Sequence, residues 1–194
     1  MTKQEVISFY ESDAHENAVA KILEQPKGII DSQKSLDGYA IVLDIDETSL
    51  NHYLPFSKAG FPQDENHEIW QILISSTNGE SIRATLDFYR YCLEKGLKIF
   101  FISARLAEYL DATKQALQSA GFHFFEDVFV FPKDIAEYES ETFKNFKAER
   151  RAYIESLGYE VLISIGDQSS DLVGGYTKYT FQVPNYMYGE NSIF

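Results

Sequence analysis

The chain of 194 residues is poor in cysteine and has no long apolar run. Its one cysteine, Cys92, excludes a disulfide framework, and the position in a helical stretch predicts a small buried side chain. A cysteine nucleophile that holds phosphate needs an arginine six positions later, and Lys98 stands there. Because no stretch of 18 apolar residues occurs, no membrane-spanning helix is expected.

Basic residues are also few, with 17 Lys and Arg against 30 Asp and Glu and a formal net charge of −13. Surfaces that bind nucleic acid need clustered Lys and Arg, so a nucleic-acid polymer is not an expected partner. An anionic substrate would need a local reversal of this charge, for which a divalent cation is the simplest source.

The histidines form no metal-binding pattern. His15, His52, His67 and His123 make no H-x-H or H-E-x-x-H pair, so a zinc site is not expected. His52 follows an acidic loop closely and could line a pocket, but we predict a lone surface histidine there.

The N-terminus predicts a helix and not a signal peptide, because Thr2 and Glu5 have capping-box spacing. We expect this helix to reach Leu23 and to end before Pro26, with a linker from there to Gly38. Residues 1–38 would then precede the first strand. Length and composition predict one domain over the whole chain, residues 1–194.

Beyond this segment, short apolar runs alternate with stretches of helical periodicity. We expect strands near 41–45, 98–102, 128–131, 161–165 and 180–183, and helices near 82–95 (with Ser81 as N-cap), 106–120 and 142–157. Such alternation predicts an α/β fold: a three-layer, Rossmann-like, doubly wound parallel sheet with helices on both faces.

Two acids follow the first strand directly, in the order Asp44-Ile45-Asp46. Open α/β sheets place their chemistry at the carboxyl ends of buried strands. Because the strand ends here, the second acid can turn away from the first and leave room for a metal ion and a phosphate. Alone, this pattern is a weak signal.

Other polar side chains follow in a matching order. Ser103, after the second strand, could bind a phosphoryl oxygen or simply cap the next helix. Lys147 shares a helix side with Ile154 and needs an anion if it faces inward; otherwise it is a snorkelling surface lysine. Asp167 and Asp171, after the fourth strand, lie one helical turn apart, which capping alone could explain.

Taken together, these motifs resemble the haloacid-dehalogenase-like (HAD) superfamily, and within it the acid phosphatases of the class B/C and plant vegetative-storage-protein type. The resemblance covers nearly the whole chain. Its motifs are Asp44 to Leu50, Phe101 to Arg105, Lys147 to Arg151, Gly166 to Leu172 and a C-terminal signature, Pro184 to Tyr188. The family usually has Thr-Gly-Arg where this chain has Ser103-Ala104-Arg105, and the hydroxyl is retained.

The resemblance implies a HAD fold whose first strand lies between the second and fourth, and a role for each site residue. Asp44 would be the nucleophile that forms an aspartyl-phosphate, and Asp46 the general acid and base. Mg²⁺ would bind Asp44, Asp167 and the backbone carbonyl of Asp46. Ser103 and Lys147 would orient the phosphate oxygens. The site would be supported by Asp171, Arg105 and Thr48.

These roles require Asp44 to be ionised by the metal while crowding keeps Asp46 protonated, which predicts an acid pH optimum. Residues 51–80 would form a small cap segment. Its aromatic residues, Tyr53, Phe56, Phe61 and Trp70, could stack on a leaving group or be core residues under a loop.

Expected substrates are phosphomonoesters, either small molecules or protein-borne: aryl phosphates, phosphotyrosine or nucleoside monophosphates. A non-enzymatic storage or binding protein on the same fold is the main alternative. Dehalogenation is a second alternative. It is disfavoured because Asp46 can handle a proton and because the acids of the site are suited to bind Mg²⁺.

Overall fold

The computed structural model describes residues 1–64, 67–132 and 140–193. Within these ranges five strands form one parallel sheet in the order β3-β2-β1-β4-β5. They are β1 (Tyr39–Leu43), β2 (Lys98–Leu106), β3 (Asp127–Phe131), β4 (Glu160–Gly166) and β5 (Tyr179–Gln182). The first strand lies between the second and fourth, as expected.

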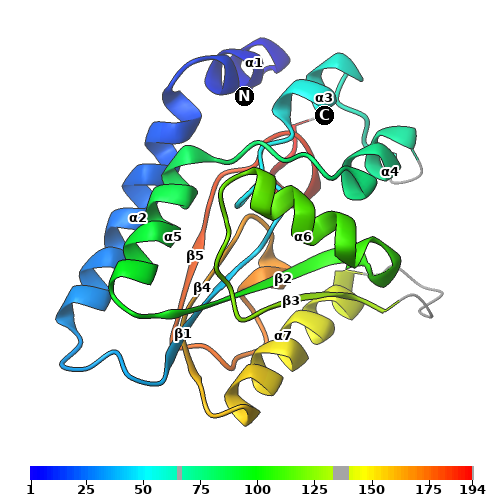
Figure 1. Ribbon diagram of the computed structural model, residues 1–194. Coiled ribbons are helices and arrows are strands. Elements are labelled where there is room, and N and C mark those ends of the chain that lie inside the picture. The colour runs from blue at the N-terminus through cyan, green and yellow to red at the C-terminus, as the bar shows by residue number, and fades with distance from the viewer. Residues whose placement is uncertain (65–66, 133–139, 194) are drawn as a thin grey trace.

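Helices cover both faces of this sheet, which confirms the three-layer α/β architecture (Figure 1). One face carries α2 (Ala14–Ser32), α5 (Arg83–Glu94) and α6 (Leu110–Ser119), and the other carries α7 (Ser140–Ser156). Because successive strand residues point to opposite faces, Ile41 and Leu43 join the first core while Ala40 and Val42 pack on the side of α7.

Cys92 lies fully buried in the larger core, as predicted. Burial raises the pKa of its thiol, which keeps it protonated and unreactive. In the described part of the chain, no helix is both long and apolar enough to cross a membrane.

The N-terminal prediction is correct at its start and wrong at its end. The Thr2–Glu5 capping box forms and opens α1 (Lys3–Glu11). The chain then bends near Ser12, and α2 continues through Pro26 as far as Ser32. A proline inside a helix removes one backbone hydrogen bond. Here the apolar stripe that packs α2 against the core outweighs this loss, because tertiary packing supplies most helical stability.

Two further helix starts differ from expectation. The N-cap of α5 is Ile82, not Ser81, and the carboxylate of Glu16 on α2 accepts hydrogen bonds from the amides of Arg83 (3.0 Å) and Ala84 (2.9 Å). This long-range cap replaces a local serine cap. The helix expected from Leu106 begins only at Leu110, after a 3-10 turn, η1 (Ala107–Tyr109), because β2 continues through Leu106.

Residues 51–80, which the sequence predicts to be a cap segment, contain α3 (Tyr53–Lys58) and α4 (Glu68–Ser75). Figure 1 shows them beyond the carboxyl ends of the strands, beside the C-terminal segment. Phe56 and Phe61 are buried in a small core with Met187, and Trp70 packs on its edge. For Phe56 and Phe61 the core interpretation is therefore correct, and they do not line an open pocket.

Candidate functional site

Three strands bring polar side chains to one edge of the sheet. Asp44 follows β1, Asp167 follows β4, and Ser103 lies in β2, beyond its last regular pairing with β3. The amide of Asp44 donates to the carbonyl of Ile165 at 2.9 Å, so the register of β1 on β4 sets the position of Asp44. This is the carboxyl edge at which parallel sheets bind ligands.

A tight loop after β1 separates Asp46 from Asp44. Glu47 has a φ of 57°, in the left-handed region that residues other than glycine seldom adopt. Its amide donates to the carbonyl of Leu50 at 2.9 Å, and the Ser49 hydroxyl donates to the carbonyl of Asp44 at 2.7 Å. The two carboxylates have different partners, Lys147 for Asp44 and Arg105 for Asp46.

Lys147 on α7 points into the site and is buried. Its Nζ donates to Oδ1 of Asp44 at 2.7 Å and also to Oδ1 of Asp171. Burial alone would lower the pKa of Lys147, but the charges of Asp171 and Asp44 outweigh this effect and raise it above the ordinary value. The snorkelling surface interpretation is thus wrong.

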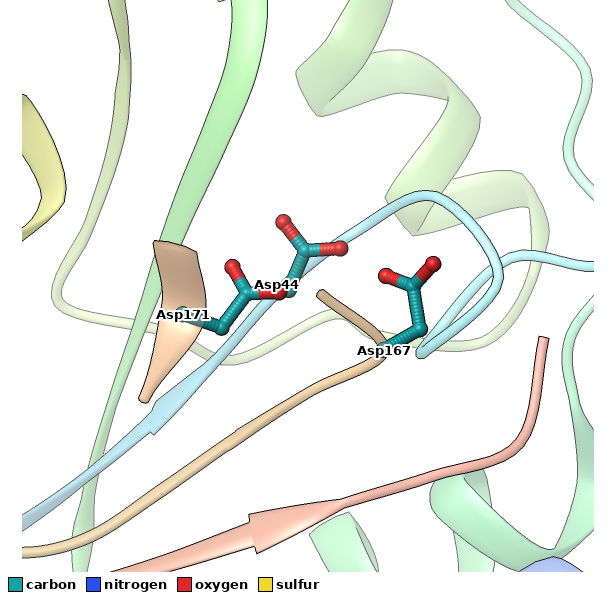
Figure 2. Close-up of side chains that lie close together, drawn as sticks. All are labelled: Asp44, Asp167 and Asp171. Atoms are coloured by element: carbon teal, nitrogen blue, oxygen red, sulfur yellow. The ribbon is translucent and has the colours of Figure 1, made fainter. Parts of the chain in front are cut away.

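Asp44, Asp167 and Asp171 form a compact acidic cluster. One carboxylate oxygen from each lies within 4.8 Å of the others, and all three residues are buried. Figure 2 shows them together, Asp44 from the end of β1, Asp167 from the end of β4, and Asp171 from a short 3-10 turn, η2 (Ser169–Asp171). The helical turn that the spacing of Asp167 and Asp171 indicated is this 3-10 turn, which brings Asp171 back to the site.

Close packing of η2 on the sheet requires a glycine at the end of β4. A Cβ at Gly166 would lie 2.1 Å from the Cβ of Asp171. The carbonyl of Asp171 also accepts hydrogen bonds from Ser164 (2.9 Å) and Arg151 (3.0 Å). These contacts hold Asp171 against Lys147.

The acidic cluster holds more negative charge than its surroundings neutralise. Burial first, and then the charge of Asp171, raise the pKa of Asp167 to about 7 and raise that of Asp44 well above its ordinary value. Lys147 is the cation that touches Asp44 and Asp171. Three hard oxygen donors with a deficit of positive charge suit a divalent cation.

Amide side chains fix the orientation of Asp167. Its Oδ2 accepts hydrogen bonds from Asn185 Nδ2 at 2.8 Å and Gln168 Nε2 at 2.5 Å. The hydroxyl oxygen of Thr48 lies 3.5 Å from the other carboxylate oxygen of Asp167, Oδ1. Asn185 is fully buried and comes from the C-terminal segment, which therefore contributes directly to the site.

Asp46 is bound by Arg105. This arginine is buried, and its guanidinium donates two hydrogen bonds to the carboxylate of Asp46. Nη2 donates to Oδ1 at 2.8 Å, and Nε donates to Oδ2 at 3.0 Å. Burial would raise the pKa of Asp46, but the charges of Arg105 and His52 and the hydrogen bonds from Arg105 outweigh it and lower the pKa to about 2. The expectation that crowding keeps Asp46 protonated is wrong for this arrangement.

Ser103 is part of the site and does not cap a helix. It lies within β2, and its Oγ accepts a hydrogen bond from the amide of Arg105 at 3.1 Å. The same hydroxyl lies 3.5 Å from Oδ2 of Asp46. The capping alternative is therefore excluded, since the next helix begins only at Leu110.

The prediction of a surface position for His52 is wrong. His52 is buried, with Nδ1 3.0 Å from Oε1 of Glu47 and 3.5 Å from Oδ1 of Asp46. The local pattern looked exposed because His52 stands in a polar loop, and the sequence does not reveal that its ring, at the N-cap of α3, meets the carboxylates of Glu47 and Asp46.

The C-terminal segment also places an aromatic side chain beside the acids. The ring of Tyr188 stacks on Phe56 at 5.0 Å and meets Trp70 edge-on at 4.7 Å. Burial, followed by the charges of Glu47, Asp167, Asp46 and Asp44, raises the pKa of the Tyr188 hydroxyl well above its usual range. Tyr188 thus packs on the small aromatic core that contains Phe56, and the charges of the acids act on its hydroxyl.

Sequence reasoning assigned no role to Glu47, Gln168, Asn185 or Tyr188. Asn185 and Tyr188 belong to the C-terminal signature, which was a signal that they lie near the site. Glu47 gave no such signal, because an acid in a polar loop is ordinarily solvated.

Comparison with known proteins places the chain in one family. The family model described as HAD superfamily, subfamily IIIB (acid phosphatase) matches residues 2–191. Among curated proteins, the chain is 29% identical over 150 residues to a stem 28 kDa glycoprotein of Glycine max, covering 76% of this chain and 58% of that protein.

Two other plant relatives show the same pattern. Acid phosphatase 1 of Solanum lycopersicum is 27% identical over 152 residues, with 76% of this chain and 57% of the relative covered. Vegetative storage protein 1 of Arabidopsis thaliana is 26% identical over 149 residues, with 76% of this chain and 54% of the relative covered. The chain therefore spans less than two thirds of the length of these relatives.

Solved structures agree on the fold. The class C acid phosphatase from Bacillus anthracis aligns with a TM-score of 0.63 and 23% identity over 88% of this chain and 71% of that one. Its crystal structure with tungstate bound gives a TM-score of 0.64 at 22% identity, with the same coverage. By the match over residues 2–191, the chain belongs to the HAD superfamily, subfamily IIIB, the family described as acid phosphatase.

Proposed function

We propose that this chain is a Mg²⁺-dependent phosphomonoesterase in which Asp44 is the nucleophile. The observation that supports this most directly is the buried contact of Asp44 with Lys147 beside Asp167. A nucleophilic carboxylate needs nearby cations, which keep it ionised and attract an incoming phosphoryl group. Membership of a family described as acid phosphatase supports the same reaction class.

The acidic cluster fits the metal that such a reaction needs. Asp44 and Asp167, together with the backbone carbonyl of Asp46, would hold Mg²⁺, which prefers hard oxygen ligands. When bound, the ion would withdraw charge from the phosphoryl oxygens. Asp171 already pairs with Lys147, so we assign it the role of orienting that lysine.

In the first step, an Asp44 oxygen attacks phosphorus. The bond between Asp44 and phosphorus forms while the bond from phosphorus to the leaving oxygen breaks, and the electron pair of that bond goes to the leaving oxygen. Lys147 and Ser103 would stabilise the transferring oxygens. Asp46 would give its proton to the leaving oxygen, so that a neutral alcohol departs.

Arg105 sets a condition on this proton transfer. While its guanidinium binds Asp46, the carboxylate is ionised and has no proton to give. A phosphate group is a strong bidentate partner for arginine. We infer that a bound phosphomonoester draws Arg105 from Asp46, and that this half-buried carboxyl then takes up a proton from solvent because its counter-charge has moved.

In the second step, water attacks phosphorus of the aspartyl-phosphate. Asp46, now ionised, accepts the proton of the attacking water. The bond between Asp44 and phosphorus breaks, its electron pair returns to the carboxylate, and inorganic phosphate is released. Asp46 therefore serves first as an acid and then as a base.

Aromatic residues at the border of the site favour substrates with a flat leaving group. Tyr188 contacts the rings of Phe56 and Trp70, and the charges of the acids act on its hydroxyl. Stacking on a tyrosyl ring favours aryl phosphates, phosphotyrosine (free or on a protein) and nucleoside monophosphates. A panel of these esters and of sugar phosphates, compared by kcat/KM, would rank them.

A storage role without catalysis is the second candidate, because one relative is named vegetative storage protein 1. Retention of Asp44 beside a buried Lys147 favours catalysis over storage. Hydrolysis of p-nitrophenyl phosphate with Mg²⁺, abolished by a chelator and restored by added Mg²⁺, is the expected result. Turnover no faster than buffer across the whole ester panel would overturn the enzymatic proposal.

A further inference from the structure

His52 lies between two carboxylates. Its Nδ1 is 3.0 Å from Oε1 of Glu47 and 3.5 Å from Oδ1 of Asp46, and its side chain is only 9% exposed. The backbone amide of His52 also donates to Oε1 of Glu47, at 3.0 Å. One Glu47 oxygen therefore holds both the backbone and the ring of His52.

Glu47 is a firm anchor for that ring. It is fully buried, and its φ of 57° fixes the loop in a conformation that few residues adopt. Its other oxygen, Oε2, has no hydrogen-bond partner among the described residues. A buried carboxylate with so few partners cannot lose the contacts from His52 without a large desolvation cost. The position of the ring is consequently fixed by the loop itself.

The Asp46 carboxylate lies between a charged group and this fixed ring. Arg105 contacts both of its oxygens, while His52 approaches Oδ1. Ser103 approaches Oδ2 at the same distance, 3.5 Å. If Arg105 turns toward a bound phosphate, these two neighbours remain, and His52 is the one whose side chain is held by a second buried carboxylate, Glu47.

We propose that His52 is a positioning residue for Asp46, which it holds in place for proton transfer to the leaving group while Glu47 holds His52. This inference rests on the proposed function, because it presumes that Asp46 protonates the leaving oxygen. In this role His52 acts through the contact of its ring with Oδ1 of Asp46, while Nδ1 stays bound to Glu47.

The role of a proton donor depends on the leaving group. When the bond to phosphorus breaks, the leaving oxygen receives the electron pair and must be stabilised by a proton if its alcohol is weakly acidic. An acidic phenol departs as the anion and needs no proton. A misplaced Asp46 therefore slows esters of weakly acidic alcohols and leaves esters of acidic phenols nearly unaffected.

Three variants, H52A, H52N and H52Q, test this on phenyl phosphate and 2,4-dinitrophenyl phosphate with Mg²⁺. The amide nitrogen of Asn can take the place of Nδ1, whereas that of Gln lies near the position of Nε2. We expect H52A and H52Q to lower kcat/KM for phenyl phosphate about 10- to 100-fold, and for the dinitrophenyl ester less than about threefold. H52N should recover most of the lost rate on phenyl phosphate.

H15A is the matched control, because His15 is also buried and packs on the ring of Tyr10. Thermal unfolding of each variant identifies losses of folding, and if H52A does not fold, the comparison of H52N with H52Q decides. Equal losses on both esters, or no loss, in a folded H52A or H52Q would overturn the positioning role. An inactive wild type would instead overturn the proposed function and this inference with it.

Discussion

The ammonium of Lys147 lies 2.7 Å from Oδ1 of Asp44 and is shared with Oδ1 of Asp171. α7 thus supplies one cation to two acids that arrive from β1 and η2, 103 and 24 residues away in the chain. The contact neutralises part of a buried acidic cluster and orients the carboxylate that we assign as nucleophile. Both consequences can be tested separately.

Asp44→Asn should abolish catalysis while the fold is kept, because an amide is a poor nucleophile of nearly the same shape. We expect kcat to fall by about 10³-fold or more. An acid quench during turnover of radiolabelled ester should trap a hydroxylamine-sensitive acyl-phosphate in the wild type and none in the variant. Asp37→Asn, at an exposed acid before β1, is the control. Near-normal turnover of D44N would exclude Asp44 as the nucleophile.

Lys147→Met should cost both activity and stability. Removal of one partner from a buried ion pair leaves charge uncompensated and destabilises a protein by about 3–5 kcal/mol. Urea unfolding at pH 8 measures this loss, and Lys21→Met, at an exposed position, controls for the substitution itself. A variant as stable as the wild type would show that the Lys147 contacts contribute little to the fold.

The fold and the main site residues were predictable because they depend on short-range patterns. Apolar runs followed by Asp44 or by Asp167 identify both the strand and the edge at which it ends, and parallel order then brings these edges together. The Thr2–Glu5 capping box is local in the same way and formed as predicted.

Features that depend on tertiary contacts could not be predicted in this way. Pro26 lies inside α2 because packing against the core compensates for its missing hydrogen bond. His52 is buried where its ring meets the carboxylate of Glu47, and Asp46 is ionised because Arg105 folds back onto it. Each outcome depends on a partner that no local pattern specifies.

The pKa of Asp167 predicts how stability depends on pH without metal. Its folded-state pKa is about 7 against an ordinary 3.8, so the folded protein retains a proton that the unfolded chain has released between these values. The contribution of Asp167 to stability therefore decreases as pH rises from about 4 to about 7 and is constant above that range. Asp167→Asn should remove this decrease, as followed by urea unfolding in a chelator. An unchanged pH slope in the variant would contradict the assignment.

Mg²⁺ should stabilise the protein most where protons no longer compete for the acidic cluster. A ligand at 100 times its dissociation constant adds about 2.7 kcal/mol, which raises the Tm of a domain of this size by about 5–10 °C. We expect a rise of this order at pH 8, a smaller one at pH 5, and none in Asp167→Asn. Sodium chloride of equal ionic strength is the control, since an equal shift with it would indicate screening and not binding.

Gly166→Ala should disrupt the site through shape alone, because a Cβ at this position would lie 2.1 Å from the Cβ of Asp171. Either η2 moves away or β4 shifts, and in both cases Asp171 no longer holds Lys147. Gly28→Ala in α2 is the matched control: nothing lies within 4 Å of its added methyl, and alanine favours a helix by about 1 kcal/mol. We expect G166A to lower both Tm and kcat while G28A maintains or raises Tm at normal kcat. If G166A retained wild-type activity, the packing of η2 on β4 would not be needed to hold the lysine against Asp44.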